Sequence, residues 1–261
     1  MLKNQRHNEI IEILKKSSFA TVAFLSKELY ASFATIRRDL TLLEKDGYVK
    51  RCHGGAMILD GKNNSPIYFR REQNANEKLI MCSSAATLIN RGDTIFLDAS
   101  TTVYHISDFL TDIQDVTVVT NGLPISMKLA ENGIKVYSTG GRLLRDSLAF
   151  VGISAEQAIS SYNADIMFFS IASVSESGIL SDWSEDEAKL RIEMSKNARK
   201  TVLMCDSSKI GTSSTFKLFD LGNIDYVITD KKLPLKIEKE FSLEILSSSP
   251  SFIYSVRNKE Q

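Results

Sequence analysis

Short apolar segments alternate with amphipathic segments over residues 74–261, and this alternation restricts the fold more than any other feature of the chain. Strands that alternate with helices form a largely parallel sheet with helices on both faces. We therefore predict an α/β fold for this region. Strands are expected at 94–98, 116–120, 135–139, 166–171, 202–205 and 226–229, and helices at 74–89, 102–110, 123–132, 154–161 and 185–198.

The segment before this alternation has the pattern of a helix-turn-helix. Thr21 and Ser32 are suitable N-caps for two short helices, because their hydroxyls can accept a bond from an N–H group of the first turn. In the second helix Ile36, Leu40 and Leu43 share one apolar face. Two helices joined by a tight turn form the unit whose second helix enters the major groove of DNA.

The other side of this second helix carries cations and hydroxyls. Thr35 and Arg38 lie opposite the apolar face, and Arg37 lies on its flank. Arginine pairs with two acceptors on guanine or clamps a phosphate. The same pattern also fits the solvated face of an ordinary three-helix cluster, whose first helix is expected at 6–16.

A basic, β-prone segment follows at 48–53, and Gly54-Gly55 makes a turn after it. Gly47 is a natural residue to end the preceding helix. A hairpin beside the recognition helix is typical of a winged helix, whose wing reaches a phosphate or the minor groove. An ordinary edge hairpin gives the same pattern, and the sequence leaves both interpretations open.

The net charge of zero conceals an uneven distribution. Residues 1–56 hold ten Lys and Arg against six Asp and Glu, so the remainder is acidic. This favours contact between a polyanion and the first part of the chain only. The loop-forming residues 60–66 mark a boundary. We predict a winged helix-turn-helix domain at 1–57, a linker at 58–73, and an effector-sensing and oligomerisation domain at 74–261.

Several features favour a cytoplasmic protein with no membrane partner. No apolar run is long enough to span a bilayer, and the first residues lack the hydrophobic segment of a signal peptide. Cys52, Cys82 and Cys205 are an odd number and lie far apart, which fits reduced thiols better than disulfides or zinc. The three histidines are equally scattered, so we expect neither a metal nor a cofactor.

Polar residues follow four of the predicted strands, and ligands of a parallel α/β sheet bind beyond the carboxyl ends of its strands. Hydroxyls at 100–102 precede a predicted helix, whose N-terminus favours an anion. Asn121 follows the second strand, and Gly140-Gly141 follow the third. Asp206 and Lys209 follow the fifth, one helical turn apart. Each group has an ordinary structural explanation, but their recurrence favours a shared polyhydroxyl or phosphate-bearing ligand.

Both halves of the chain resemble the DeoR family of bacterial transcriptional regulators. The segment Thr35-Ile36-Arg37-Arg38-Asp39-Leu40, Gly47 and the run Arg51-Cys52-His53-Gly54-Gly55-Ala56 are similar to that family's helix-turn-helix signature and wing. The second half of the chain is similar to that family's sensor domain. The residues that carry this similarity are Asp98, Ser100, Thr101, Thr102, Thr120, Asn121, Gly140, Gly141, Gly152, Asp206, Ser207, Ser208, Lys209, Thr229 and Asp230.

The resemblance implies a repressor of a sugar-utilisation operon. Its sensor domain would be related to ribose-5-phosphate isomerase and would respond to a phosphorylated sugar. The implied DNA contacts are Ser32, Thr35, Arg37, Arg38, Arg51 and His53. The implied effector site consists of Asp98, Ser100, Thr101, Thr102, Asn121, Gly140, Gly141 and Lys209, among which Lys209 is the best candidate for a phosphate partner.

Three positions depart from the family pattern. Ser170 and Ser173 replace glycines in the loop after the fourth strand, and serine does not allow the same close approach of the backbone. Arg191 stands where the following helix of the family has lysine. We hypothesise that this loop moves the sugar end of the ligand, while the anion site at 100–102 is kept.

Two alternatives to a sensing regulator stay open. Asp98, Asp206 and Lys209 could move a proton in an isomerase-like enzyme, although such an enzyme has no use for a DNA-binding domain. The second domain could also serve oligomerisation alone. A homodimer or homotetramer on double-stranded operator DNA is expected in every DNA-binding version, because one short recognition helix reads too few base pairs.

Overall fold

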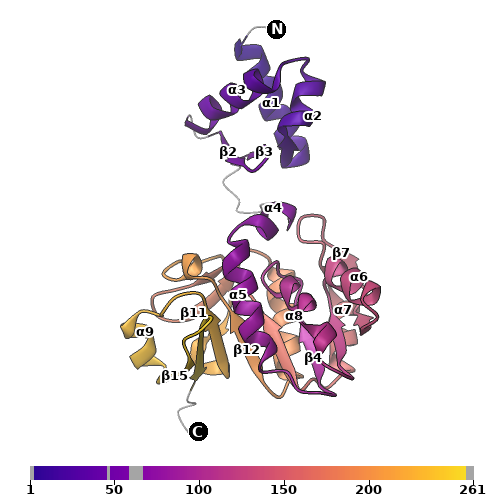
Figure 1. Ribbon diagram of the computed structural model, residues 1–261, viewed down its shortest axis with the longest axis vertical. Helices are drawn as coiled ribbons and strands as arrows, with labels where there is room; N and C mark the ends of the chain where they lie inside the picture. Colours follow the sequence, from indigo (N-terminus) through magenta and orange to yellow (C-terminus); the bar gives the residue numbers. More distant parts are fainter. Residues whose placement is uncertain (1–2, 46–47, 59–66, 257–261) are drawn as a thin grey trace. The chain divides into compact units, whose positions relative to one another are not determined.

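The computed structural model describes residues 3–45, 48–58 and 67–256. The chain separates into two compact units, Met1–Arg70 and Arg71–Gln261, and Figure 1 follows it from indigo to yellow. The predicted linker 58–73 contains a helix, α4 (Ile67–Glu72), that sequence analysis missed because six residues show too little periodicity. The predicted turn at Gly47 and the loop 60–66 lie outside the described residues.

The first unit combines three helices with a small antiparallel sheet, and its elements follow here in chain order. They are α1 (Lys3–Ser17), β1 (Phe19–Thr21), α2 (Val22–Glu28), α3 (Phe33–Lys45), β2 (Val49–Cys52) and β3 (Gly55–Ile58). The three predicted helices and the hairpin are confirmed. Strand β1, which pairs with β3, was not predicted, since three residues are too few to show an alternating pattern.

Both predicted N-caps of the helix-turn-helix are present. Thr21 Oγ1 accepts a bond of 3.0 Å from the N–H of Phe24 at the start of α2. Ser32 Oγ accepts one of 3.2 Å from the N–H of Thr35 at the start of α3. Each hydroxyl therefore fixes where a helix begins.

The apolar face of α3 is buried in the first unit as predicted. Ile36, Leu40 and Leu43 pack in one cluster with Ile10 of α1 and Leu25 of α2. This burial fixes which face of α3 remains free.

A glycine allows β3 to pass close to β1. A Cβ atom at Gly55 would lie 2.3 Å from the carbonyl oxygen of Ala20. Any larger residue at position 55 would push these two strands apart.

The second unit is built on an eight-stranded sheet in the order β15-β16-β14-β12-β9-β4-β5-β6. Its strands are β4 (Thr94–Leu97), β5 (Thr117–Thr120), β6 (Lys135–Ser138), β9 (Ile166–Phe169), β12 (Thr201–Met204), β14 (Tyr226–Thr229), β15 (Leu243–Ser247) and β16 (Phe252–Val256). Neighbouring strands from β6 to β14 are parallel, while β15 and β16 pair antiparallel. The mostly parallel α/β fold and all six predicted strands are confirmed.

Helices cover both faces of this sheet. They are α5 (Ala75–Ala86), α6 (Leu123–Glu131), α7 (Ile153–Ser160), α8 (Glu185–Lys196) and α9 (Leu235–Glu240), with short 3-10 helices η1 (Val103–Asp108), η2 (Leu110–Asp112), η3 (Ser207–Lys209) and η4 (Leu221–Asn223). Residues of α5, η1 and α6 pack on one face, and residues of α7, α8 and α9 pack on the other. Figure 1 shows α5 in front of the strands of the sheet.

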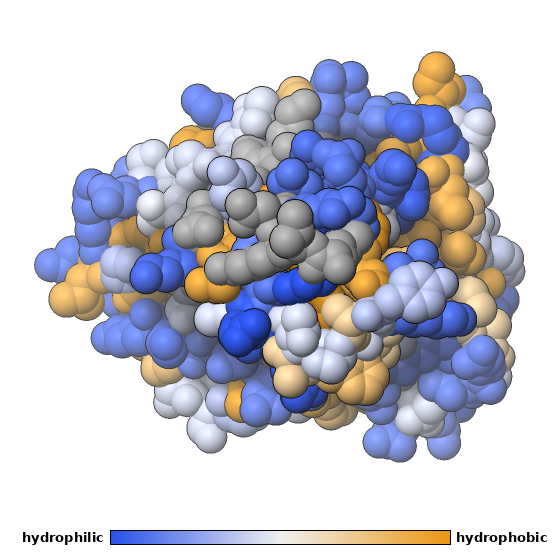
Figure 2. All heavy atoms as spheres, turned by 90° about the horizontal axis from the view of Figure 1, so that it is seen from above, coloured by the Kyte–Doolittle hydropathy of each residue, from blue (hydrophilic) through white to orange (hydrophobic). Residues whose placement is uncertain are grey.

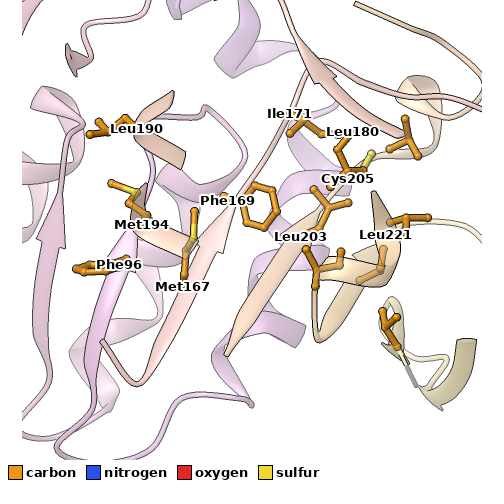
Figure 3. Packing of buried hydrophobic residues seen from close by; sticks show 14 of the residues in the cluster. Phe96, Met167, Phe169, Ile171, Leu180, Leu190, Met194, Leu203, Cys205 and Leu221 are labelled. Atoms are coloured by element: carbon orange, nitrogen blue, oxygen red, sulfur yellow. The ribbon is translucent and has the colours of Figure 1, made fainter. Parts of the chain in front are cut away.

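Successive residues of the central strands point to opposite faces, and both faces are buried. Figure 3 shows one core, in which Phe96, Met167 and Phe169 lie along neighbouring strands close to Leu190 and Met194 of α8. Strands buried on two sides read as continuous apolar runs, which is why the sequence predicted them well.

The structure corrects one predicted helix and adds elements that were not predicted. The segment 102–110 forms the 3-10 helices η1 and η2 rather than an α-helix. A second sheet contains β10 (Ser173–Val174), β11 (Ile179–Asp182) and β13 (Phe216–Asp220), and β7 (Arg142–Leu143) pairs with β8 (Phe150–Val151). Most of these additional strands are too short, or too exposed, to give a clear apolar pattern.

Hydrophilic residues predominate on the face of the molecule in Figure 2, and apolar residues form separate smaller patches there. Within the described ranges, none of the helices combines the length and hydropathy that a membrane span requires.

Candidate functional site

The recognition helix α3 presents two exposed arginines. Arg37 and Arg38 are exposed, and no hydrogen bond or ion pair involves either guanidinium within the described part of the chain. Thr35 is half-buried near the start of the helix, and its hydroxyl lies 2.9 Å from that of the capping Ser32. The predicted DNA-contact residues of α3 therefore lie along its solvent side.

The wing, formed by β2 and β3, is joined to α3 by Arg51, which is one of the predicted DNA-contact residues. Arg51 Nη1 donates to Thr41 Oγ1 over 2.6 Å, and its backbone N–H donates to Glu44 Oε1 over 2.8 Å. Thr41 lies one helical turn beyond Arg38, so Arg51 stands next to the exposed side of α3. His53 is exposed at the turn between β2 and β3.

Asp39 forms a buried ion pair that sequence analysis did not predict. Its carboxylate is buried and accepts bonds from Arg6 Nε at 2.6 Å and from His7 Nε2 at 3.1 Å. Burial alone would raise the pKa of Asp39, but hydrogen bonds from these two residues outweigh burial and lower it. The sequence did contain a signal for this ion pair. Asp39 lies beside Ile36, Leu40 and Leu43 on the apolar face of the helix, where a buried carboxylate needs a partner.

In the second unit, loops that follow three neighbouring strands meet around Lys209. The ammonium of Lys209 lies 3.6 Å from Asp206 Oδ2 and donates to Ser170 Oγ over 3.0 Å. The backbone N–H of Ser170 donates to Asp98 Oδ2 over 3.3 Å. The loops after β4, β9 and β12 are thus joined by direct contacts.

A second lysine, Lys78 of α5, belongs to the same cluster and was not predicted. Its side chain is only 4% exposed, and Nζ donates to Thr101 Oγ1 over 3.2 Å. Lysine 78 shares the buried side of α5 with Met81, Cys82 and Ala85. The sequence signal for Lys78 was a lysine on the apolar face of a predicted helix, because lysine is seldom buried without a partner.

Lys209 and Lys78 both affect the pKa of Asp206. Burial raises the pKa of Asp206, but the charge of Lys209 and the hydrogen bonds from Ser208 outweigh burial, and Lys78 contributes in the same direction. The pKa of Asp206 is therefore lowered. The charged form of Asp206 is favoured, and this holds Lys209 at the strand ends.

Asp98 is held by Arg191, the residue that departs from the family pattern. Arg191 Nε donates to Asp98 Oδ2 over 2.7 Å, and Nη1 donates to Asp182 Oδ2 over 2.8 Å. All three side chains are largely buried. Burial alone would lower the pKa of Arg191, but the charges of Asp182 and Asp98 raise it. The side chain of Asp98 therefore supports the loop that it begins.

In the loop after β4, the positive charge that would attract an anion has a different source from the helix N-terminus that we predicted. Ser100 Oγ accepts a bond of 3.2 Å from the N–H of Val103, and the helix that follows is the six-residue 3-10 helix η1. Such a short helix has little dipole, so positive charge near Ser100, Thr101 and Thr102 comes chiefly from Lys78.

The remaining predicted effector residues lie on the neighbouring loops. Asn121 Nδ2 donates to the carbonyl of Phe150 over 3.1 Å, and the next residue, Gly122, packs against Ala99. Gly140 and Gly141 both have positive φ, and Gly141 lies against Val151 and Ala155. Thr101 therefore contacts Lys78 directly, and Asp98 is connected to Lys209 through Ser170. The loop that contains Asn121 lies next to Ala99 through Gly122.

Three buried oxygen atoms around these loops have no hydrogen-bond partner within the described residues. They are Thr102 Oγ1, Asn121 Oδ1 and Ser147 Oγ. Buried polar atoms are nearly always paired in folded proteins, so unpaired ones commonly indicate a bound water or ligand. Ser147 was not predicted, and no pattern in the sequence distinguishes it.

A helix-turn-helix with free arginines, joined in one chain to an α/β unit with a polar cluster at its strand ends, defines a DNA-binding transcriptional regulator with a sensor domain. Residues 6–62 match the DeoR-like helix-turn-helix domain, and residues 73–231 match the DeoR C-terminal sensor domain. The chain belongs to the DeoR family of transcriptional regulators, as its sequence motifs predicted.

Similar proteins cover nearly the whole chain. It is 34% identical to the HTH-type transcriptional regulator GolR of Listeria innocua, over 92% of this chain and 96% of that protein. It is 33% identical to the putative aga operon transcriptional repressor of Escherichia coli O157:H7, over 88% and 87%. It is 32% identical to the HTH-type transcriptional repressor GlcR of Bacillus subtilis, over 88% and 90%.

A weak likeness to a solved structure accompanies these matches. Ribose 5-phosphate isomerase A of Methanocaldococcus jannaschii aligns with 72% of this chain and 83% of its own, at 16% identity and a TM-score of 0.41.

Proposed function

We propose that this regulator is a cytoplasmic repressor of a sugar-utilisation operon, and that a phosphorylated sugar bound in the second unit releases it from DNA. The observation that carries the proposal is the pair of lysines at the strand ends. Lys78 and Lys209 lie beside the hydroxyl groups of Thr101 and Ser170. Thr102, next to Thr101, has a buried hydroxyl oxygen that finds no partner among the described residues. Ammonium groups bind phosphate, while hydroxyl and amide oxygens bind the hydroxyls of a sugar.

The DNA-binding part of the proposal assigns contacts to Ser32, Thr35, Arg37, Arg38, Arg51 and His53. The exposed arginines of α3 would read a base edge or bind a phosphate, and the wing would bind the adjacent backbone. A homodimer or homotetramer would place two recognition helices on paired half-sites. Two of the three relatives described above are named repressors, which supports repression rather than activation.

The effector part assigns Asp98, Ser100, Thr101, Thr102, Asn121, Gly140, Gly141 and Lys209 to the ligand, and we now add Lys78. Ser170 Oγ accepts from Lys209, and its Cβ occupies space that a glycine would leave open. This supports our hypothesis that the loop repositions the sugar end of the ligand while the anion end is kept.

We infer that the second unit is not an isomerase. A general base needs a pKa near the working pH, whereas Lys209 and Ser208 lower the pKa of Asp206. Asp98 is engaged by Arg191 and by the backbone N–H of Ser170. A turnover assay with sugar phosphates over a range of pH tests this inference, and catalysis that disappears in Asp206→Asn would contradict it.

The experiment that tests the proposal is a titration of the full-length protein on DNA from upstream of its own gene. Affinity is measured at fixed salt, without ligand and with each member of a panel of sugar phosphates and the matching unphosphorylated sugars. We expect one sugar phosphate to weaken DNA binding and its unphosphorylated form to have no effect. Tight DNA binding that no member changes would favour a second unit that serves oligomerisation alone.

A further inference from the structure

Asn74 joins two helices in a conformation that few residues tolerate. It lies between α4, which ends at Glu72, and α5, which begins at Ala75, and its φ and ψ of 52° and 38° are left-handed. Its side chain does not cap α5. Instead Nδ2 donates to Asp206 Oδ1 over 3.1 Å and lies 3.5 Å from Ser208 Oγ. The junction between the two helices is thereby connected to the loop after β12.

Arg71, in the last turn of α4, contacts the other loop of the proposed effector site through an aromatic ring. Its guanidinium carbon lies 3.8 Å from the centroid of the Tyr104 ring. Tyr104 belongs to η1, which follows Ser100–Thr102 directly, and the ammonium of Lys128 lies 4.4 Å from the same ring. A cation at this distance is attracted to the face of the aromatic ring.

One turn further along, Lys78 of α5 donates to Thr101. Within the short segment 71–78, Asn74 and Lys78 therefore contact the two loops to which we assign the phosphate, and Arg71 contacts the helix η1 that follows one of them. This segment begins in the last turn of α4, and the chain before it, up to Arg70, belongs to the first unit. No other part of the described second unit is closer in sequence to the recognition helix.

We propose that Arg71 and Asn74 are positioning residues that transmit anion binding at the strand ends to α4, and so to the DNA-binding unit. This inference rests on the proposed function. Asn74 and Lys209 share one carboxylate, Asp206, through separate oxygens. An anion that attracts the ammonium of Lys209 leaves more of the Asp206 charge to the amide of Asn74. An anion that binds Ser100–Thr102 likewise fixes η1, and with it Tyr104 and Arg71.

This arrangement provides what coupling between two sites requires. A ligand can shift the position of a distant element only if its contacts differ between two arrangements of that element. Here the end of α4 and the junction after it have contacts, through Arg71 and Asn74, that depend on the charge and the order of both loops. Binding in the second unit therefore alters the freedom of the segment that leads to the recognition helix.

The test uses the full-length protein with inorganic phosphate as the probe. Calorimetry measures phosphate binding, and amide hydrogen exchange measures the opening of residues 67–78 with and without phosphate. The variants are Arg71→Met, which removes one cation from the Tyr104 ring, and Asn74→Gly, which keeps the left-handed backbone but removes the amide. Lys128→Met is the matched control, because it removes the other cation near the same ring without a change in α4.

We expect phosphate to slow exchange in 67–74 of the unmodified protein. In Arg71→Met and Asn74→Gly, phosphate affinity should change by less than about twofold, while the effect on exchange falls by about fivefold or more. Lys128→Met should keep the effect.

Other results would overturn the inference. One is phosphate binding that leaves the exchange of 67–74 unchanged in the unmodified protein, and another is full coupling in both variants. The proposed function survives either result. An unmodified protein that does not bind phosphate at all would instead refute the proposed anion site, and this inference with it.

Discussion

Arg6 Nε donates a hydrogen bond of 2.6 Å to Asp39 Oδ2 and thereby joins the first helix to the recognition helix. The two residues are 33 positions apart in the chain. His7 binds the other carboxylate oxygen at 3.1 Å. Because Asp39 has no exposed surface, its orientation, and that of α3, depends on these partners. The recognition helix is thus held by a buried ion pair as well as by apolar packing.

Asp39→Asn should destabilise the DNA-binding unit by about 2 kcal/mol. Removal of one member of a fully buried ion pair costs about 3–5 kcal/mol, and the value is smaller here because Arg6 retains some contact with solvent. Denaturant unfolding followed by circular dichroism measures the change. Glu12→Gln, which removes an exposed carboxylate that pairs with Lys15, is the control and should leave the unfolding midpoint where it was.

Asp39 should also make this unit sensitive to acid. Its pKa is lower in the folded protein than in the unfolded chain. Its contribution to stability is therefore complete above the unfolded-state pKa of about 4 and is lost as the pH falls through the folded-state pKa. The difference in unfolding free energy between the unmodified protein and Asp39→Asn should be constant near neutral pH and shrink in acid. A difference that grows on acidification would show that the carboxylate is not stabilised by its partners.

Arg38→Ala should weaken binding to the operator by about 1–3 kcal/mol if the guanidinium reads a base edge. Binding to unrelated DNA should then change little. Fluorescence anisotropy on specific and random duplexes at several salt concentrations measures both. Lys16→Ala, which removes one exposed charge from α1, is the control. An equal loss on all sequences with a shallower salt slope would identify a phosphate contact instead.

Lys209→Ala should weaken effector binding by roughly 10-fold to 100-fold, because a hydrogen bond to a charged group contributes about 1.5–3 kcal/mol. DNA affinity without effector should not change. Calorimetry with the active sugar phosphate and anisotropy on operator DNA measure the two quantities. Lys217→Ala removes an exposed lysine from β13 and should behave like the unmodified protein. Undiminished effector binding in Lys209→Ala would disprove the assigned role.

Arg191→Met should destabilise the second unit by about 3–5 kcal/mol, because it leaves Asp98 and Asp182 buried without their cation. Arg191→Lys should recover only part of this loss, since one ammonium cannot reproduce the two bonds that Nε and Nη1 donate to separate carboxylates. Denaturant unfolding of the three proteins gives the order. If Arg191→Lys is as stable as the unmodified protein, the two separate bonds of the guanidinium do not contribute to the stability of the second unit.

The prediction from sequence was most successful where local patterns decide the structure. The hydroxyls of Thr21 and Ser32 lie next to the N–H groups that they cap, so neighbours in the chain are enough to place α2 and α3. Central strands such as β9 are buried on both faces and appear as apolar runs. The helix expected at 102–110 was wrong because apolar spacing alone does not distinguish a 3-10 helix from an α-helix.

The sequence by itself determined the family, the helix-turn-helix, the parallel sheet and the strand-end positions from which a ligand can be bound. Only the tertiary structure revealed the partners. Arg6 with Asp39, Lys78 with Thr101 and Arg191 with Asp98 are joined across 33, 23 and 93 residues. Such contacts have no local signature, because a buried charge requires a counter-charge but does not specify from which part of the chain it comes.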